Sequence, residues 1–401
     1  MKIKDLFIWI FMFSSCALLA IGRLYDERLE FFGVNIGVVL SVIYFLSVIL
    51  LLFSIKTVIF SKSKILVYSF YLLVLIMGPI LWTIFDITEY GVEKAINFWL
   101  IVMPISIVVI EKYHRTDVVR TFYILLGVVC FLALLSSIGL SLSERTDSRM
   151  AALGGGPIVF ARWMGFGIFT LLFLPVKINS LFKYFLIVFF LVLALASGSR
   201  GPVLALFLTF IVYVFLNFNR IFIRVSLLIF VLLLSFMFSG IGSKISELGN
   251  SQRVFMNISK KGGNKQSTST RKNLAIGSLI LLQHYPLGVG AGNWQVISNE
   301  LNPTHLMPLE YPHNLLLEVA CEYGIHTLLI LLLLFLYVLH LGYSKMIQYK
   351  KYSTSLYPLL FYLFLFLFLN SLVSGMLNDS RLLFIVISFI IINKPLVITD
   401  E

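Results

Sequence analysis

Long apolar runs alternate with short polar segments along most of the chain. An α-helix needs about 20 residues to cross the apolar core of a bilayer. Runs near that length, with the fourth and the last shorter, fall at 5–22, 34–55, 64–84, 96–111, 119–141, 157–176, 182–198, 201–218, 222–240, 315–343, 356–375 and 381–394. This pattern predicts an all-α integral membrane protein with about twelve transmembrane helices.

The composition supports this class. Hydrophobic residues make up 59% of the 401 residues and charged residues only 12%, whereas a soluble protein carries about 25% charged residues. We predict that 5–22 is a membrane helix and not a cleaved signal, because no small-residue cleavage site with a soluble domain follows it. Cys16, Cys130 and Cys321 lie far apart in or beside apolar runs, so we expect buried thiols and no disulfide or metal site.

The distribution of basic residues predicts the orientation in the membrane. If the N-terminus is cytoplasmic, sixteen lysines and arginines fall on the cytoplasmic side and seven in short loops on the other side. The positive-inside rule then places both termini in the cytoplasm. This topology accounts for the net charge of +12, because the basic residues lie mainly in loops between the helices. We therefore expect the lipid bilayer, and not nucleic acid, as a partner. The seven residues are Arg23, Arg28, Lys94, Arg145, Arg149, Arg200 and Arg381.

Residues 241–314 form the one long interval that is not mostly apolar, and they separate helices over 1–240 from helices over 315–401. Without its histidines this interval holds seven basic and three acidic residues. We therefore predict a long extracytoplasmic loop that meets an anionic ligand at the membrane surface. Within it, 270–284 has the pattern of an amphipathic helix lying on the membrane, with Arg271 near its N-terminal end.

Two short segments carry candidate chemistry. In 196–202, ASGSRGP, Pro202 suits the first turn of a helix, and Arg200 offers two-pronged binding of phosphate at that helix N-terminus. A tight helical hairpin with an interfacial arginine is the alternative. In 311–314, YPHN, a neutral His313 could take a proton from an attacking hydroxyl. A capping or interfacial histidine is the alternative there.

Several other polar residues fall among the apolar runs. Arg162 either faces a polar cavity or snorkels to the interface. Asp379 and Arg381 are interpreted as a surface ion pair, and Glu318 either orients His313 or faces a polar groove. Trp294 ends the glycine-rich segment HYPLGVGAGNW and suits an interfacial or sugar-stacking position. The spacing of His, Cys, Asp and Glu predicts no metal site.

Three elements, taken in order, resemble the O-antigen polymerase and O-antigen ligase superfamily of bacterial membrane glycosyltransferases. They are the turn SGSRG at 197–201, the segment HYPLGVGAGNW at 284–294, and Pro-His-Asn at 312–314 followed by Glu-Tyr-Gly-Ile at 322–325. The resemblance covers roughly 195–325. It implies an enzyme of the bacterial inner membrane that uses no cofactor or metal and takes its glycan from undecaprenyl diphosphate at the periplasmic face.

The resemblance also implies roles for individual residues. Arg200 and an arginine of the external loop would hold the diphosphate, and His313 would be the base on the acceptor hydroxyl. The loop arginine maps to Arg271, with Arg253 as a rival. We expect further contacts with the substrate from Arg162, Ser199, Trp294, Asn314, Glu318 and Arg253.

Three functions fit this pattern. A polymerase would join one lipid-linked chain to another lipid-linked repeat, with inversion at the anomeric carbon and with a chain-length regulator as a further partner. A ligase would move the finished chain to lipid A–core. We favour the polymerase because GGGPIVFAR, with Arg162, resembles that region of polymerases. A flippase for the lipid-linked glycan is the third hypothesis, but no internal repeat is evident.

Overall fold

The computed structural model describes residues 3–25, 29–31, 33–55, 61–138, 156–174, 178–217, 264–301, 311–392 and 394–397. Its helices are α1 (Ile3–Ile21), α2 (Ile36–Phe53), α3 (Lys62–Trp82), α4 (Glu89–Asn97), α5 (Met103–Lys112), α6 (Arg115–Ser137), α7 (Pro157–Phe173), α8 (Ser180–Ala196), α9 (Arg200–Leu216), α13 (Asn264–His284), α14 (Trp294–Leu301), α15 (Leu315–Tyr323), α16 (Ile325–Gln348), α17 (Tyr357–Ser374) and α18 (Arg381–Ile391). A π-helix (Phe98–Val102) joins α4 to α5, and a 3-10 helix (Asn378–Ser380) precedes α18. The strands β1 (Glu30–Phe31) and β2 (Val34–Asn35) form a small antiparallel pair.

The predicted class, a multi-pass helical membrane protein, is confirmed. Within the described ranges, six helical segments are long and apolar enough to cross a membrane: α2, α3, the run Glu89–Lys112, α6, α16 and α17. Residues 5–21 of α1, and α7, α8 and α9, are apolar but shorter. The number of twelve spans stays a prediction, and the helix predicted over 222–240 lies outside the described residues.

Two predicted helix boundaries are wrong. The predicted helix over 315–343 is divided into α15 and α16 by Gly324, whose φ of +89° suits glycine and ends α15. The loop helix predicted from residue 270 begins at Asn264, so Arg271 lies in its second turn and not at its N-terminal end. The polar residues before Arg271 continue the helix because they include no proline or glycine that would end it.

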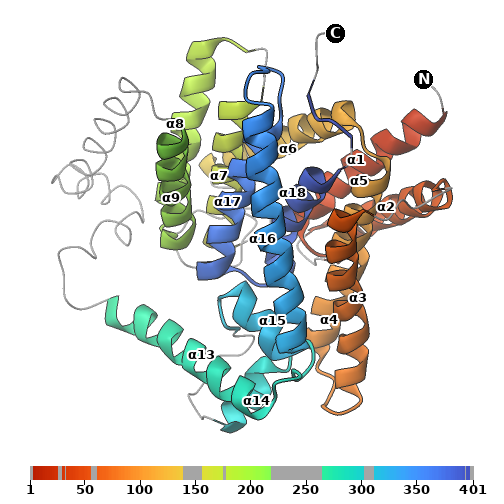
Figure 1. Ribbon diagram of the computed structural model, residues 1–401, viewed down its shortest axis with the longest axis vertical. Helices are drawn as coiled ribbons and strands as arrows, with labels where there is room; N and C mark the ends of the chain where they lie inside the picture. The colour runs from red at the N-terminus through yellow and green to blue at the C-terminus, as the bar shows by residue number, and fades with distance from the viewer. Residues whose placement is uncertain are drawn as a thin grey trace.

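The two chain ends lie at one end of the bundle, and α13 and α14 lie at the other (Figure 1). Helix α9 begins at the same end as α13, and α15 lies there as well (Figure 1). This end is called the α13 end below. The arrangement agrees with the prediction that both termini share one side of the membrane, while the side itself stays a prediction.

Helix α18 is the centre of the bundle. Every residue from Arg381 to Ile391 is buried, although a helix at the edge of a bundle would expose one face. The ring of Phe384 stacks on Phe70 and meets Phe98 edge-on, with both centroids 5.5 Å away. Since α18 also contacts α5 and α17, its first residue, Arg381, is carried into the packed interior.

The glycine-rich segment 284–294, which follows α13, contacts the end of α15 through backbone hydrogen bonds. The amides of Val289 and Gly290 donate to the carbonyl oxygens of Cys321 and Glu322 at the end of α15, each over 2.9 Å. Gly290 has a φ of +90°, a conformation that glycine adopts without strain. The backbone of this segment therefore connects α15 to α13.

Trp294 has a packing role in this arrangement. Its side chain is 1% exposed and packs with Leu274 and Leu281 of α13. Its indole Nε1 donates to the Ser278 hydroxyl over 3.0 Å. Because its side chain is covered, Trp294 is not open to a sugar in this structure, and the sugar-stacking position suggested for it is wrong here, while an interfacial position stays a prediction.

Gly91 of α4 offers a test of this packing, because a Cβ at that position would collide with the carbonyl oxygen of Ala291. We expect Gly91→Ala to lower stability by about 1–3 kcal/mol, the usual cost of overpacking. The matched control is Gly127→Ala in α6, where a Cβ meets nothing within 4 Å. Thermal unfolding in detergent measures both, and equal melting temperatures would contradict this account of the contact.

Candidate active site

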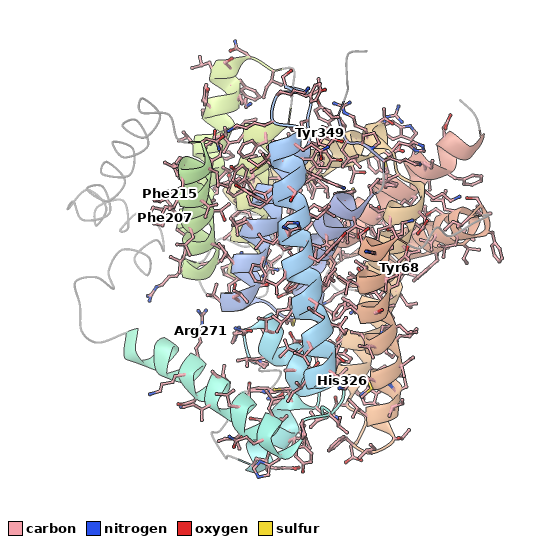
Figure 2. The ribbon with its side chains drawn as sticks, viewed as in Figure 1. Tyr68, Phe207, Phe215, Arg271, His326 and Tyr349 are labelled. Carbon is pink, nitrogen blue, oxygen red and sulfur yellow. The ribbon has the colours of Figure 1, made fainter. Side chains whose placement is uncertain are left out.

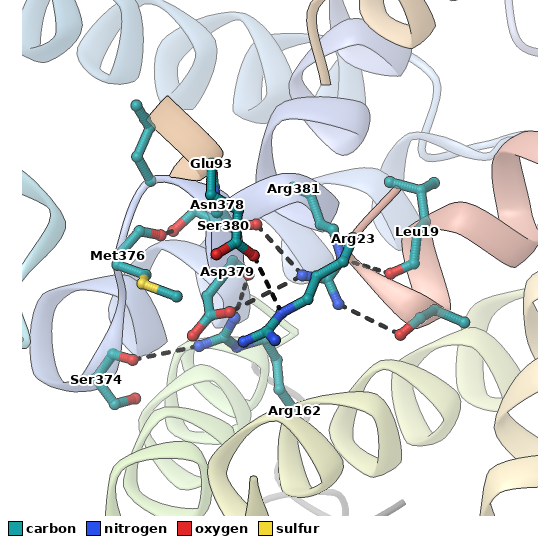
Figure 3. A network of polar contacts seen from close by, with 12 residues as sticks. Leu19, Arg23, Glu93, Arg162, Ser374, Met376, Asn378, Asp379, Ser380 and Arg381 are labelled. Atoms are coloured by element: carbon teal, nitrogen blue, oxygen red, sulfur yellow. Dashed lines mark hydrogen bonds and ion pairs between the residues drawn. The ribbon is translucent and has the colours of Figure 1, made fainter. Parts of the chain in front are cut away.

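Charged side chains from several helices converge on the turn between α17 and α18. This turn, residues 375–380, follows the end of α17 that lies toward α13 (Figure 1), and its contacts are drawn in Figure 3. Arg162 of α7 donates to the carbonyl oxygen of Asp379 and, over 3.4 Å, to that of Ser374. Arg381 donates to the carbonyl oxygens of Leu19 and Ala20 at the end of α1. The 375–380 turn thus joins α7, α1 and α18 through two guanidinium groups.

The interpretation of Asp379 and Arg381 as a surface ion pair is wrong. Arg381 is 7% exposed, and its Nη1 lies 3.9 Å from the Asp379 carboxylate. Arg381 is buried because α18 is enclosed on all sides, and its donors are matched by carbonyl oxygens, as a buried guanidinium requires. The pair therefore belongs to the interior of the α13 end.

Arg162 faces this same polar network and does not snorkel to an interface. It is 4% exposed and its Nη atoms contact backbone carbonyls of the 375–380 turn and of α17. Its Nε is buried, with no hydrogen-bond partner among the described residues. These contacts show Arg162 holding the turn, and its contact with substrate stays a prediction.

Lys94 of α4 and two glutamates of α15 form a second buried group, called the Lys94 triad below. The Lys94 ammonium forms an ion pair with Glu318 and another with Glu322, 2.5 Å away, and all three side chains are at most 2% exposed. The other oxygen of Glu318 accepts the amide of Leu377 over 2.8 Å. The triad therefore also holds the 375–380 turn, from the side of α15.

The charges of these two groups balance. The triad has one cation and two carboxylates, while Arg162, Arg381 and Asp379 add two cations and one carboxylate. Burial raises the pKa of Glu318 and of Glu322, and the Lys94 cation opposes that rise. Since the positive and negative charges are equal in number, this network has no surplus cation for an anionic ligand.

His313 lies beside this network, where the chain enters α15. The alternative role of helix cap is wrong for it, because Asn314 caps α15. The Asn314 side-chain oxygen accepts the amides of Leu316 and Leu317 over 2.9 and 3.1 Å. Its amide nitrogen donates to the carbonyl oxygen of Leu372 over 2.9 Å. Asn314 therefore fixes the chain at His313, and its contact with substrate stays a prediction.

The surroundings of His313 keep its imidazole neutral. Burial and, to a smaller extent, the positive charge of Arg271 lower the pKa of His313 while the Asp379 carboxylate raises it, and together they bring it to about 4. The ring of Tyr311 lies 4.1 Å from the imidazole, centroid to centroid. A neutral imidazole near pH 7 can accept a proton, which is what a general base requires.

Arg200 and Arg271 are exposed arginines at the α13 end. Arg200 is the first residue of α9, after a tight turn in which Gly198 has a φ of +68°. The start of α9 packs on the end of α17, since a Cβ on Gly201 would lie 3.1 Å from Val373. The sequence offered a tight helical hairpin and a helix N-terminus at Arg200 as alternatives, and this one turn has both features. Ser199 is buried within the turn.

Arg271 points from α13 toward the bundle (Figure 2). Its charge acts on the pKa of His313, so these two residues, 42 positions apart in the sequence, lie near each other. The rival, Arg253, lies outside the described residues. The structure thus brings His313, Arg271 and the start of α9 to one end of the bundle, as predicted, while their chemical roles stay predictions.

Sequence reasoning missed Lys94, Asp379 and Tyr311. Lys94 was counted among loop residues, although it lies in a helix and is 2% exposed. One signal was available: Glu318 and Glu322 are four residues apart in an apolar segment, so their side chains share a helix face and require a buried cation. No pattern identifies which of the 31 basic residues supplies it.

Comparison with known proteins agrees with the resemblance seen in the sequence. Residues 185–332 match the family described as O-Antigen ligase. This range includes most of α8, all of α9, α13, α14 and α15, and the start of α16, and it is consistent with the O-antigen polymerase and ligase superfamily. No curated protein matches the chain.

Removing the Lys94 cation tests how the α13 end is held together. Lys94→Met leaves two buried carboxylates without a counter-charge, so we expect a loss of about 3–5 kcal/mol in stability. Lys94→Met combined with Glu318→Gln and Glu322→Gln removes all three charges and should recover part of this loss. Thermal unfolding and yield in detergent measure both, with Lys272→Met on the exposed face of α13 as control. A single variant as stable as the wild type would disprove the role of the triad.

Proposed function

Because residues 185–332 match the O-Antigen ligase family, we propose that the chain transfers a glycan from undecaprenyl diphosphate to a hydroxyl group at the periplasmic face of the inner membrane. The observation that carries this proposal is His313: a neutral imidazole, with a pKa lowered to about 4, beside the exposed cation of Arg271. A base and a cation near each other at the α13 end suit a reaction in which a proton is removed and a diphosphate departs.

The proposed reaction couples a proton transfer to the exchange of one carbon–oxygen bond for another at the anomeric carbon. The acceptor hydroxyl gives its proton to His313 while its oxygen bonds to the anomeric carbon of the donor. The bond between that carbon and the diphosphate oxygen breaks, and the diphosphate leaves with the electron pair. Attack from the face opposite the leaving group inverts the anomeric configuration.

Arginine is well suited to the leaving group. Breaking the sugar–phosphate bond adds negative charge to a diphosphate, and fixed donors that face this charge stabilise the transition state. We assign this role to Arg200 and Arg271, which are exposed at the α13 end. Arg162 and Arg381 are buried, with contacts to backbone carbonyls, and are assigned to holding the 375–380 turn.

Within this class we propose a polymerase, because the sequence around Arg162 resembles that of polymerases. The acceptor is then a second lipid-linked repeat unit, and a chain-length regulator is a further candidate partner. A ligase is the second candidate, because the matched family is described by that activity. The two differ only in the acceptor, so both use the same donor chemistry.

The surface polysaccharide of a deletion strain distinguishes these functions. We expect lipopolysaccharide with a single repeat, because ligation continues and extension stops. Complementation with His313→Ala should give the same pattern, and His284→Ala, an exposed histidine of α13, should restore long chains. The readout is gel electrophoresis, with immunoblotting to confirm that each variant is in the membrane.

Other outcomes have definite meanings. Bare core with long glycan on undecaprenyl diphosphate would identify a ligase. Bare core with single repeats on the cytoplasmic face would identify a flippase. Long chains restored by His313→Ala would remove His313 from the chemistry.

Arg200 is tested through its geometry. Arg200→Lys keeps the charge but loses the planar two-pronged donor, so we expect activity to fall about 10-fold or more. Arg200→Ala should fall further, because the charge is lost as well. Lys272→Ala, an exposed cation of α13, is the matched control and should leave activity near wild type. Full activity of Arg200→Lys in a transfer assay would reduce Arg200 to a point charge.

A further inference from the structure

The backbone of His313 is fixed in a conformation that few residues adopt. Its φ is +55°, and it is the one non-glycine residue with positive φ in the part of the chain that the structure describes. Histidine tolerates this left-handed conformation better than most residues. Asn314 holds the next position through α15 and Leu372. The Cα atom of His313 is therefore held in place relative to α15 and α17.

Within the described part of the chain, Nδ1 of the His313 imidazole lacks the hydrogen bond that usually orients a catalytic histidine. Such a ring is generally fixed by a hydrogen bond from one ring nitrogen to a carboxylate or a carbonyl. The Nδ1 of His313 is buried, and among the described residues it has no hydrogen-bond partner. The described contact that bears on the ring's orientation is therefore one with a neighbouring side chain.

Tyr311 provides that contact. Its ring centroid lies 4.1 Å from that of His313, and the two planes meet at 45°. This is closer than any other pair of aromatic rings described in the structure, where the next nearest centroids are 5.0 Å apart. Pro312, which is buried, joins the two residues and restricts the chain between them.

The charged groups around His313 come from two other elements. Arg271 of α13 lowers the pKa of the imidazole, and Asp379 of the 375–380 turn raises it. These two effects oppose each other, and burial is the largest cause of the lowered pKa. The side chain that covers the imidazole therefore has a large influence on its protonation.

We propose that Tyr311 is a positioning residue for His313, whose ring fixes the orientation of the imidazole and shields it from water where the acceptor hydroxyl binds. This inference rests on the proposed role of His313 as the base. The contact requires an aromatic ring and not the phenol hydroxyl. Phenylalanine at position 311 should therefore keep the imidazole in its orientation, and alanine should not.

The test compares Tyr311→Ala and Tyr311→Phe in nanodiscs. We expect Tyr311→Ala to lower kcat about 10- to 100-fold, part of what a general base contributes, with KM within about twofold of wild type. Tyr311→Phe should stay within about twofold in both. In Tyr311→Ala water reaches the imidazole, so the acid limb of the pH–rate profile should move upward from about pH 4 toward 6.5.

A second readout does not depend on activity. NMR titration of protein labelled with ¹³C-histidine, with His313→Gln to assign the signal, should show the same upward movement of the His313 pKa in Tyr311→Ala and none in Tyr311→Phe. If Tyr311→Ala does not fold, Tyr311→Leu, which keeps bulk without a planar ring, takes its place with the same expectation.

The outcomes separate this inference from the proposed function. A His313 titration that is the same in all variants would overturn the role of Tyr311. A raised KM with unchanged kcat would also overturn it, because Tyr311 would then contact the glycan directly. If the wild type transfers no glycan, the proposed function fails, while the titration still tests whether Tyr311 shields His313.

Discussion

A lysine buried between two carboxylates is the interaction on which the α13 end depends. Lys94 forms ion pairs with Glu318 and Glu322, and Glu318 also accepts the amide of Leu377. Arg162 donates to the carbonyl oxygen of Asp379 in the same turn and to that of Ser374 just before it. Since a buried charge without a partner is costly, none of these side chains can be removed alone. Helices from both halves of the chain are thereby held as one unit beside His313.

The four arginines considered for the site fall into two groups with different environments. Arg162 and Arg381 are buried and donate to backbone carbonyls, whereas Arg200 and Arg271 are exposed at the α13 end. The buried charges cancel one another, so an approaching anion meets mainly the exposed pair. This division supports a site in which the interior network sets the geometry and the exposed cations bind the leaving group.

Periodicity and hydropathy predict most of the helices, because a membrane helix is a long apolar run. They predict neither the break at Gly324, which depends on the backbone conformation of one residue, nor the start of α13, which lies in a polar stretch without apolar periodicity. Local motifs point to Arg200 and His313 and the family resemblance points to Arg271, and the roles of all three stay predictions. The glutamate partners of Lys94 and the contacts of Arg381 with the carbonyl oxygens of Leu19 and Ala20 cannot be predicted in this way, because these contacts join residues more than 200 positions apart. Trp294 shows the opposite error: an aromatic residue after a glycine-rich segment suggests a sugar, and packing accounts for it.

The most direct test of the account is transfer by the purified protein. Wild-type protein in nanodiscs receives one undecaprenyl diphosphate-linked repeat as both donor and acceptor, in EDTA, and products are followed by mass spectrometry between pH 5 and 8. Because the pKa of His313 is about 4, the base stays neutral over this range. The account predicts longer lipid-linked glycans at a rate that does not fall as the pH decreases from 7 to 5. No elongation, or a rate that falls with a midpoint near the ordinary histidine pKa of about 6.5, would contradict it.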